Sequence, residues 1–111
     1  MNKVSRIKKW HRDVAEYGQP NGWNELQLGV YQAIGLHIDE FEAAMDERKL
    51  AITLDQSTAA VRHAVEKINQ KTVLIRVLDC SQDRSSEGHS YGLTLAANVK
   101  GLTPTKPRKV H

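Results

Sequence analysis

Polar side chains between positions 58 and 67 share one face of a short amphipathic segment: Thr58, Arg62, His63 and Lys67. Apolar side chains recur at helical spacing on the other face: Val61, Ala64, Val65 and Ile68. The polar face combines hydrogen-bond donors with positive charge, because Arg carries a planar fork of donors, Lys an ammonium group and His an imidazole that titrates near neutral pH. Such a face can donate hydrogen bonds to polar edges and neutralise an anionic partner. Ser57 stands directly before it and can cap the helix with its side-chain oxygen.

The residue types that catalysis or metal binding needs do not occur in the required patterns. The sequence holds no glycine-rich phosphate loop, no nucleophile elbow and no paired metal-ligand spacing. Cys80 and His89 flank a polar segment, and His37 stands near Asp39, but isolated residues of this kind are usually ordinary loop or surface residues. We therefore expect no enzyme activity, no metal and no cofactor.

Length and composition predict one compact domain with a modest core. The chain has 111 residues, of which 40% are hydrophobic. No apolar run reaches membrane-spanning length, and the N-terminus lacks the apolar segment of a secretion signal. A single cysteine, Cys80, leaves no internal disulfide and fits a reducing compartment. We expect a cytoplasmic protein without a membrane partner.

Charge is distributed unevenly along the chain, although the formal net charge is only +3. Five cations precede the first acid, Asp13: Lys3, Arg6, Lys8, Lys9 and Arg12. The last part of the chain holds only basic charges: Lys100, Lys106, Arg108 and Lys109. An acidic group lies between them: Asp39, Glu40, Glu42, Asp46 and Glu47. This asymmetry fits a protein that binds a polyanion with its basic surfaces and directs its acidic surfaces away from it. Basic ends can also be solvated tails.

The first half of the chain predicts helices. Residues 2–17 carry an apolar seam of Ile7, Trp10, Val14 and Tyr17, which either packs against a second copy or covers the protein's own core. Turn residues at 18–22 end this helix. A second stripe then follows, made of Trp23, Leu26, Val30 and Ile34 with Tyr31 beside it. Asp39 with Glu42 predicts the start of a further helix through a capping box, and residues 40–54 form either one helix or two.

Residues 50–68 resemble the helix-turn-helix of DNA-binding regulators. The matching positions are Leu50, Ala51, Leu54, Ser57, Val61, Ala64, Val65 and Ile68. Ala51 and Ala64 are small enough to let the two helices approach closely. Two turn positions depart from the pattern: Asp55 stands where glycine is usual, and Gln56 where an apolar residue is usual. Asp55 can still adopt the left-handed backbone conformation at a modest energetic cost.

After residue 71 the apolar period changes from that of a helix to that of a strand. Residues 72–79 place Val73, Ile75 and Val77 on one face, and residues 90–99 alternate in the same way around a polar linking segment. The order of helix, turn, helix and hairpin resembles a winged helix. The expected fold class is mainly α with a C-terminal β-hairpin, a winged helix-turn-helix with an extra N-terminal helix. The expected segments are 1–22 (basic helix and turn), 23–99 (winged helix-turn-helix domain) and 100–111 (basic flexible tail).

The resemblance implies a transcriptional regulator that inserts residues 57–70 into the major groove of double-stranded DNA. It assigns DNA contacts to Ser57, Thr58, Ala59, Arg62, His63, Lys67 and Arg84. Among these Arg62 is the expected base reader, since its fork matches a guanine edge. Ser57 and Lys67 are expected at phosphates, and Arg84 at the hairpin tip is opposed there by neighbouring acids.

One such module reads few base pairs, so a homodimer on an inverted repeat is expected, with the seam of Ile7, Trp10, Val14 and Tyr17 as its interface. Two alternatives stay open. The first is a protein-interaction module on the same scaffold, which uses the acidic surface from Asp39 to Glu47; Glu66 on the polar helix face favours it. The second is an origin-binding or partition protein of a plasmid or phage. The small size suits a regulator from a mobile genetic element, either repressor or activator.

Overall fold

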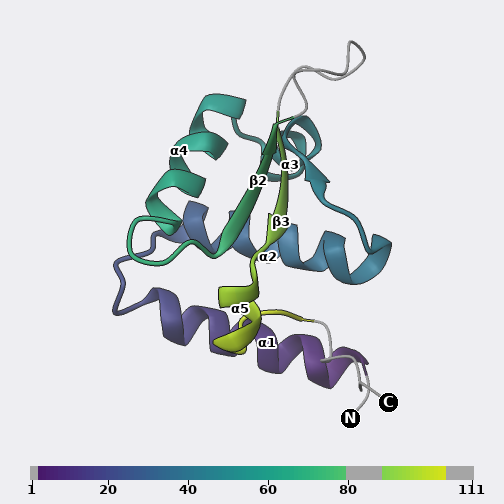
Figure 1. Cartoon of the computed structure of the whole chain (residues 1–111), viewed down its shortest axis with the longest axis vertical. Coiled ribbons are helices and arrows are strands. Elements are labelled where there is room, and N and C mark those ends of the chain that lie inside the picture. The colour runs from purple at the N-terminus through teal and green to yellow at the C-terminus, as the bar shows by residue number, and fades with distance from the viewer. Residues whose placement is uncertain (1–2, 80–88, 105–111) are drawn as a thin grey trace.

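The fold is a set of helices arranged around a small antiparallel sheet (Figure 1). The structure is a computed structural model that describes residues 3–79 and 89–104. In this part of the chain the helices are α1 (Lys3–Gly18), α2 (Glu25–Phe41), α3 (Glu47–Leu54), α4 (Thr58–Ile68) and α5 (Leu95–Val99). The strands are β1 (Met45–Asp46), β2 (Ile75–Asp79) and β3 (His89–Leu93). The predicted fold class, mainly α with a β-hairpin after the last long helix, is confirmed.

Helix α2 is the element against which most others pack. Its N-terminus carries a capping box, because the Asn24 side chain accepts from the Gln27 backbone N–H at 2.8 Å and the Gln27 side chain accepts from the Asn24 N–H at 2.7 Å. The predicted apolar stripe is confirmed, since Val30, Tyr31 and Ile34 are fully buried.

The helix start predicted at Asp39 is wrong. Helix α2 continues through Gly35 and Asp39 and ends at Phe41, and its C-cap residue, Glu42, adopts the left-handed conformation. Asp39 does not cap a helix but pairs with Arg6 at 3.0 Å. Gly35 lies within the helix, and its missing side chain makes room for Trp10. An added Cβ would lie 2.4 Å from the indole ring. Between residues 40 and 54 only the second part is a new helix, α3, which Asp46 caps.

The sheet has the strand order β1-β3-β2, and all neighbours are antiparallel. Tyr91 lies in the central strand, with Met45 opposite on one side and Val77 opposite on the other. The Asn69 side chain, just after α4, holds the start of β2: it accepts from the N–H groups of Leu74 and Ile75 and donates to the Ile75 carbonyl, each at 3.0 Å. The strand β1 was not predicted, because two residues are too short to show alternation.

The strand predicted over residues 90–99 is wrong beyond Leu93. Thr94 accepts from the Ala97 N–H at 3.2 Å and caps α5, in which alanine favours the helix. Ala97 is buried, whereas Leu95 and Val99 are exposed. The apolar alternation of this stretch therefore reflects a short helix with one buried residue.

Helix α1 and the segment after α5 close the back of the core. Trp10 and Val14 are 3% and 0% exposed within the monomer. The predicted dimer seam is therefore wrong for these two residues, and its other interpretation, as a cover for the protein's own core, is confirmed. The Leu102 carbonyl accepts from Trp10 Nε1 at 2.9 Å and from the Tyr31 hydroxyl at 2.7 Å. Leu102 is buried as well, so the flexible tail predicted from residue 100 is wrong for residues 100–104; residues 105–111 lie outside the described part.

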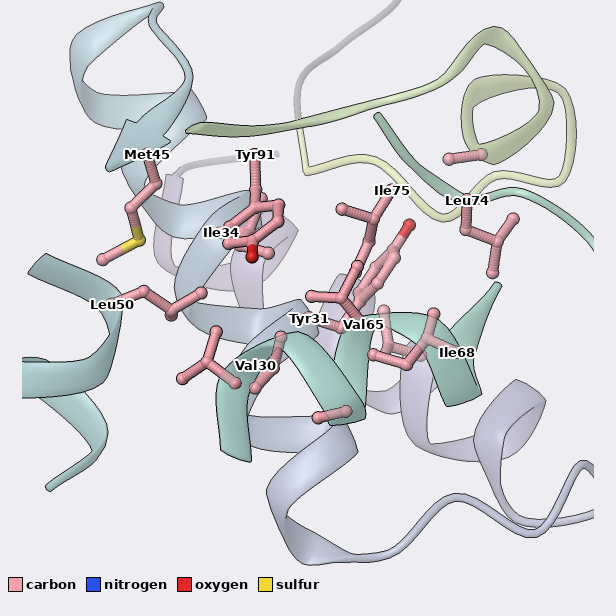
Figure 2. Close-up of a cluster of buried hydrophobic side chains, with 14 of the residues drawn as sticks. Val30, Tyr31, Ile34, Met45, Leu50, Val65, Ile68, Leu74, Ile75 and Tyr91 are labelled. Atoms are coloured by element: carbon pink, nitrogen blue, oxygen red, sulfur yellow. The ribbon is translucent and has the colours of Figure 1, made fainter. Parts of the chain in front are cut away.

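Figure 2 shows how the core joins these elements. Val30, Tyr31 and Ile34 of α2 meet Val65 and Ile68 of α4 below the strands. Tyr91 stands beside Met45 and Ile34, and Leu50 of α3 closes the cluster. The buried face of α4 is thus fixed by apolar contact, which leaves its opposite face outward.

Candidate nucleic-acid interface

Helices α3 and α4 are joined by a tight turn at Asp55, Gln56 and Ser57. Asp55 adopts the left-handed conformation, with φ 52° and ψ 48°, as predicted for a residue at the glycine position. The Gln56 N–H donates to the Ala51 carbonyl at 2.9 Å, so the polar residue at this position does not open the turn. Ser57 then caps α4, as predicted, by accepting from the Ala60 N–H at 3.1 Å. The two predicted helices and the tight turn between them are therefore present.

The two faces of α4 are those that the sequence predicts. The apolar stripe of Val61, Ala64, Val65 and Ile68 is buried. The exposed residues include Ser57, Thr58, Ala59, Arg62, His63, Glu66 and Lys67. The first turn of the exposed face carries small side chains, and its later turns carry cationic or ionisable ones. This order allows close approach near the N-terminus and charge contact further along.

Arg62, the expected base reader, is bonded to a carboxylate of the same molecule. Its Nε donates to Glu47 Oε2 at 2.8 Å, and its Nη2 donates to Glu47 Oε1 at 3.0 Å. This is the two-pronged contact that a guanine edge would require, and here a carboxylate of the same molecule occupies it. The sequence did not predict this contact, because the partner lies 15 residues earlier in a different helix.

Glu47 is the residue of this site that sequence reasoning missed. Its side chain is 3% exposed, and it also accepts from the Tyr91 hydroxyl at 2.5 Å. Burial alone would raise the pKa of Glu47, but the hydrogen bonds from Arg62 and Tyr91 outweigh it and hold the pKa below its ordinary value. Burial and the bond to this carboxylate raise the pKa of Tyr91. In the sequence Glu47 is indistinguishable from the acids around it.

A groove with a mixed polar and apolar lining runs beside α4. Its volume is about 340 Å³, and it separates His63, Lys67 and Gln70 from the turn before α2, where Asn21, Gly22 and Asn24 lie. Among the residues that line this groove, Lys67 carries a full positive charge. The contribution of this turn was not predicted, although the spacing of Asn24 and Gln27 is a readable capping-box signal.

No protein-family model, curated protein or solved structure matches this chain. Within residues 3–79 and 89–104, no helix is long and apolar enough to cross a bilayer. The same residues bring together no group of three or more His, Cys, Asp or Glu side chains that could hold a metal ion.

The acidic surface predicted from Asp39 to Glu47 is largely used inside the molecule. Asp39 pairs with Arg6, and Glu47 is buried against Arg62 and Tyr91. Asp46 caps α3 by accepting from the Arg48 N–H at 2.8 Å. Glu40 and Glu42 are exposed, but they no longer belong to a continuous acidic patch.

The remaining predicted contacts lie elsewhere. Arg84 and Cys80 are outside the described residues. The basic N-terminal half of α1 lies across α2 from α4: Figure 1 shows its purple end at the lower right and α4 at the upper left.

Proposed function

We propose that this protein is a transcriptional regulator that binds double-stranded DNA sequence-specifically, with α4 in the major groove. The observation that carries the proposal is the combination at α4: a capped helix that follows a tight turn, with a buried apolar face and a polar face of exposed residues. A hairpin follows directly, in the order expected of a winged helix. The major groove of B-DNA is wide enough to admit one such helix.

In this proposal base reading falls to the first two turns of α4. Thr58 and His63 offer a hydroxyl and an imidazole to base edges, and Ala59 offers a methyl group to a thymine methyl. Lys67 and Ser57 contact phosphates, which position the helix without reading sequence. The groove beside Lys67 gives a flanking phosphate room between α4 and the turn at Asn21.

The proposal includes a homodimer on an inverted repeat, because one helix contacts too few base pairs to select a site in a genome. Its interface excludes Trp10 and Val14, which are buried in the monomer. Sedimentation of the free protein and of its complex with selected DNA measures the stoichiometry.

A protein-interaction module remains the second candidate. Two observations favour it: Glu66 is exposed on the same face of α4, and the Arg62 fork is committed to Glu47. An origin-binding or partition protein would bind DNA by the same chemistry, so it differs from a regulator only in the location of its sites.

The test is selection of binding sites from a random double-stranded library, followed by titration of wild type and Thr58→Asp. An acid at this position stabilises the helix N-terminus, yet it places negative charge against DNA. We expect the variant to keep its thermal stability and to lose selective binding. The matched control is Ala43→Asp, which adds the same charge at an exposed site beyond the end of α2.

Equal loss of binding in the two variants would mean that total charge alone governs attraction to DNA. If wild type selects no sequence, the DNA-binding proposal is wrong and the protein-interaction module becomes the first candidate.

A further inference from the structure

We propose that Glu47 and Arg62 form a positioning pair, which sets the orientation of α4 on DNA, and that Arg62 affects recognition through Glu47 rather than by contacting a base. The inference rests on the proposed function and deepens it. It concerns which residue of α4 decides specificity, and by what means.

The Glu47 carboxylate belongs structurally to the sheet. Glu47 follows β1 directly, and both residues of β1 pair with β3, Met45 with Tyr91 and Asp46 with Ser90. The Tyr91 hydroxyl then holds the carboxylate from the other side. Backbone pairing and a buried hydrogen bond therefore fix the position of this carboxylate relative to the hairpin.

Arg62 transfers that position to α4. Two parallel hydrogen bonds to both carboxylate oxygens define distance and orientation together, which a single charge contact does not. The apolar face of α4 decides which side is inward, but apolar contact is non-directional and tolerates small rotations. The fork adds a directional restraint.

The restraint acts on the part of α4 that approaches bases. Asn69 already ties the C-terminal end of the helix to the start of β2. Arg62 lies in the N-terminal half, one turn after Thr58 and next to His63. With both ends held, the helix and the hairpin approach DNA as one body.

Arg62 has a physical reason to stay with Glu47 when DNA is bound. Moving the fork to a base would leave the carboxylate, 3% exposed, with Tyr91 as its remaining described hydrogen-bond donor. An uncompensated charge at such a site is strongly unfavourable.

The test is a double-mutant cycle on DNA binding with Glu47→Gln, Arg62→Gln and both together, plus Arg62→Lys. Two quantities are measured for each: the ratio of affinities for the selected site and for random DNA, and the slope of log affinity against log salt. Thermal melting verifies folding. Arg62→Lys keeps the positive charge but loses the two-pronged donor, and Glu47→Gln keeps the side-chain shape but loses the negative charge. These two variants are sufficient for the test if the others do not fold.

We expect every single variant to lower the affinity ratio by about tenfold, and the double variant to be no worse than either single one. Arg62→Gln should leave the salt slope of specific binding unchanged. Lys67→Gln serves as the phosphate control and should lower that slope by about one without altering the ratio.

Three kinds of result would overturn the inference. Additive losses in the cycle, or a salt slope that falls by about one in Arg62→Gln, would place Arg62 on the DNA itself. Tighter selective binding by Glu47→Gln would mean that the carboxylate withholds Arg62 from DNA. Failure of wild type to select any site overturns the proposed function and this inference together, and so differs from the first two results.

Discussion

Helices α1 and α4 are both amphipathic and basic, but they differ in what surrounds their charges. On α1, Lys9 pairs with Asp13 at 3.0 Å, and Arg6 bonds Asp39 and the Pro104 carbonyl. Its exposed Lys8 and Arg12 line a hollow whose lining residues all belong to α1 itself, so no second element of the described chain faces them there. The charges of α4 stand between a tight turn and a hairpin, and Lys67 borders a groove. The placement of α4 among other elements, more than its number of cations, makes it the candidate nucleic-acid interface.

The largest expected effect tests how α1 is attached. Gly35→Ala puts a Cβ 2.4 Å from Trp10, so it should push α1 away from α2 and lower the free energy of unfolding by about 3 kcal/mol. Chemical denaturation measures this. The control is Gly29→Ala, whose Cβ meets Leu54 at an ordinary 3.5 Å and should stabilise helix α2 by about 0.5 kcal/mol. Similar results for both variants would mean that Trp10 does not hold α1 in this way.

The next effect concerns the attachment of α4. Arg62→Ala leaves the Glu47 carboxylate buried with Tyr91, and we expect the free energy of unfolding to fall by about 2 kcal/mol. Replacing all three partners, as Glu47→Leu with Arg62→Met and Tyr91→Phe, should recover most of the loss, because neither a charge nor a hydroxyl is then buried without a partner. A loss below about 0.5 kcal/mol for Arg62→Ala would place the pair among ordinary surface ion pairs.

A third prediction compares the two helices directly. Lys67→Ala should weaken binding to all DNA sequences by about fivefold and lower the salt slope by about one, since it removes a phosphate contact. Lys8→Ala removes the same charge from α1 and should change neither quantity. Fluorescence anisotropy at two or more salt concentrations measures both, and an equal effect of the two substitutions would remove the distinction between the helices.

The smallest expected effect sharpens the comparison at the turn before α4. Asp55 holds a left-handed conformation that glycine adopts without steric cost. Asp55→Gly should therefore raise the free energy of unfolding by about 0.5 kcal/mol, which a thermal melt would show as a slightly higher melting temperature. Glu42→Gly, at the end of α2 with φ 51°, is the matched control and should behave alike. A destabilised Asp55→Gly would show that the aspartate side chain itself supports the turn.

Local patterns in the sequence were sufficient to predict α4 and its turn. The period of Val61, Val65 and Ile68 and the capping type of Ser57 act within a few residues of each other. Strand β1 and helix α5 were beyond this reasoning, because two residues show no period and five residues with one buried alanine imitate alternation. The candidate site was predicted in its outward face but not in its chemistry, because the contact of Arg62 with Glu47 depends on how α3 and α4 cross.

The Leu102 carbonyl has a consequence for folding during synthesis. It accepts from Trp10, 92 positions earlier, and from Tyr31, 71 positions earlier. Helices emerging from a ribosome form within microseconds, far faster than residues are added, yet these two donors stay without this acceptor until residue 102 has cleared the exit tunnel. The indole of Trp10 and the phenol of Tyr31 therefore become fully sequestered only after residue 102 has emerged, and Trp10 fluorescence on stalled nascent chains of increasing length, in a Trp23→Phe background, should report that step.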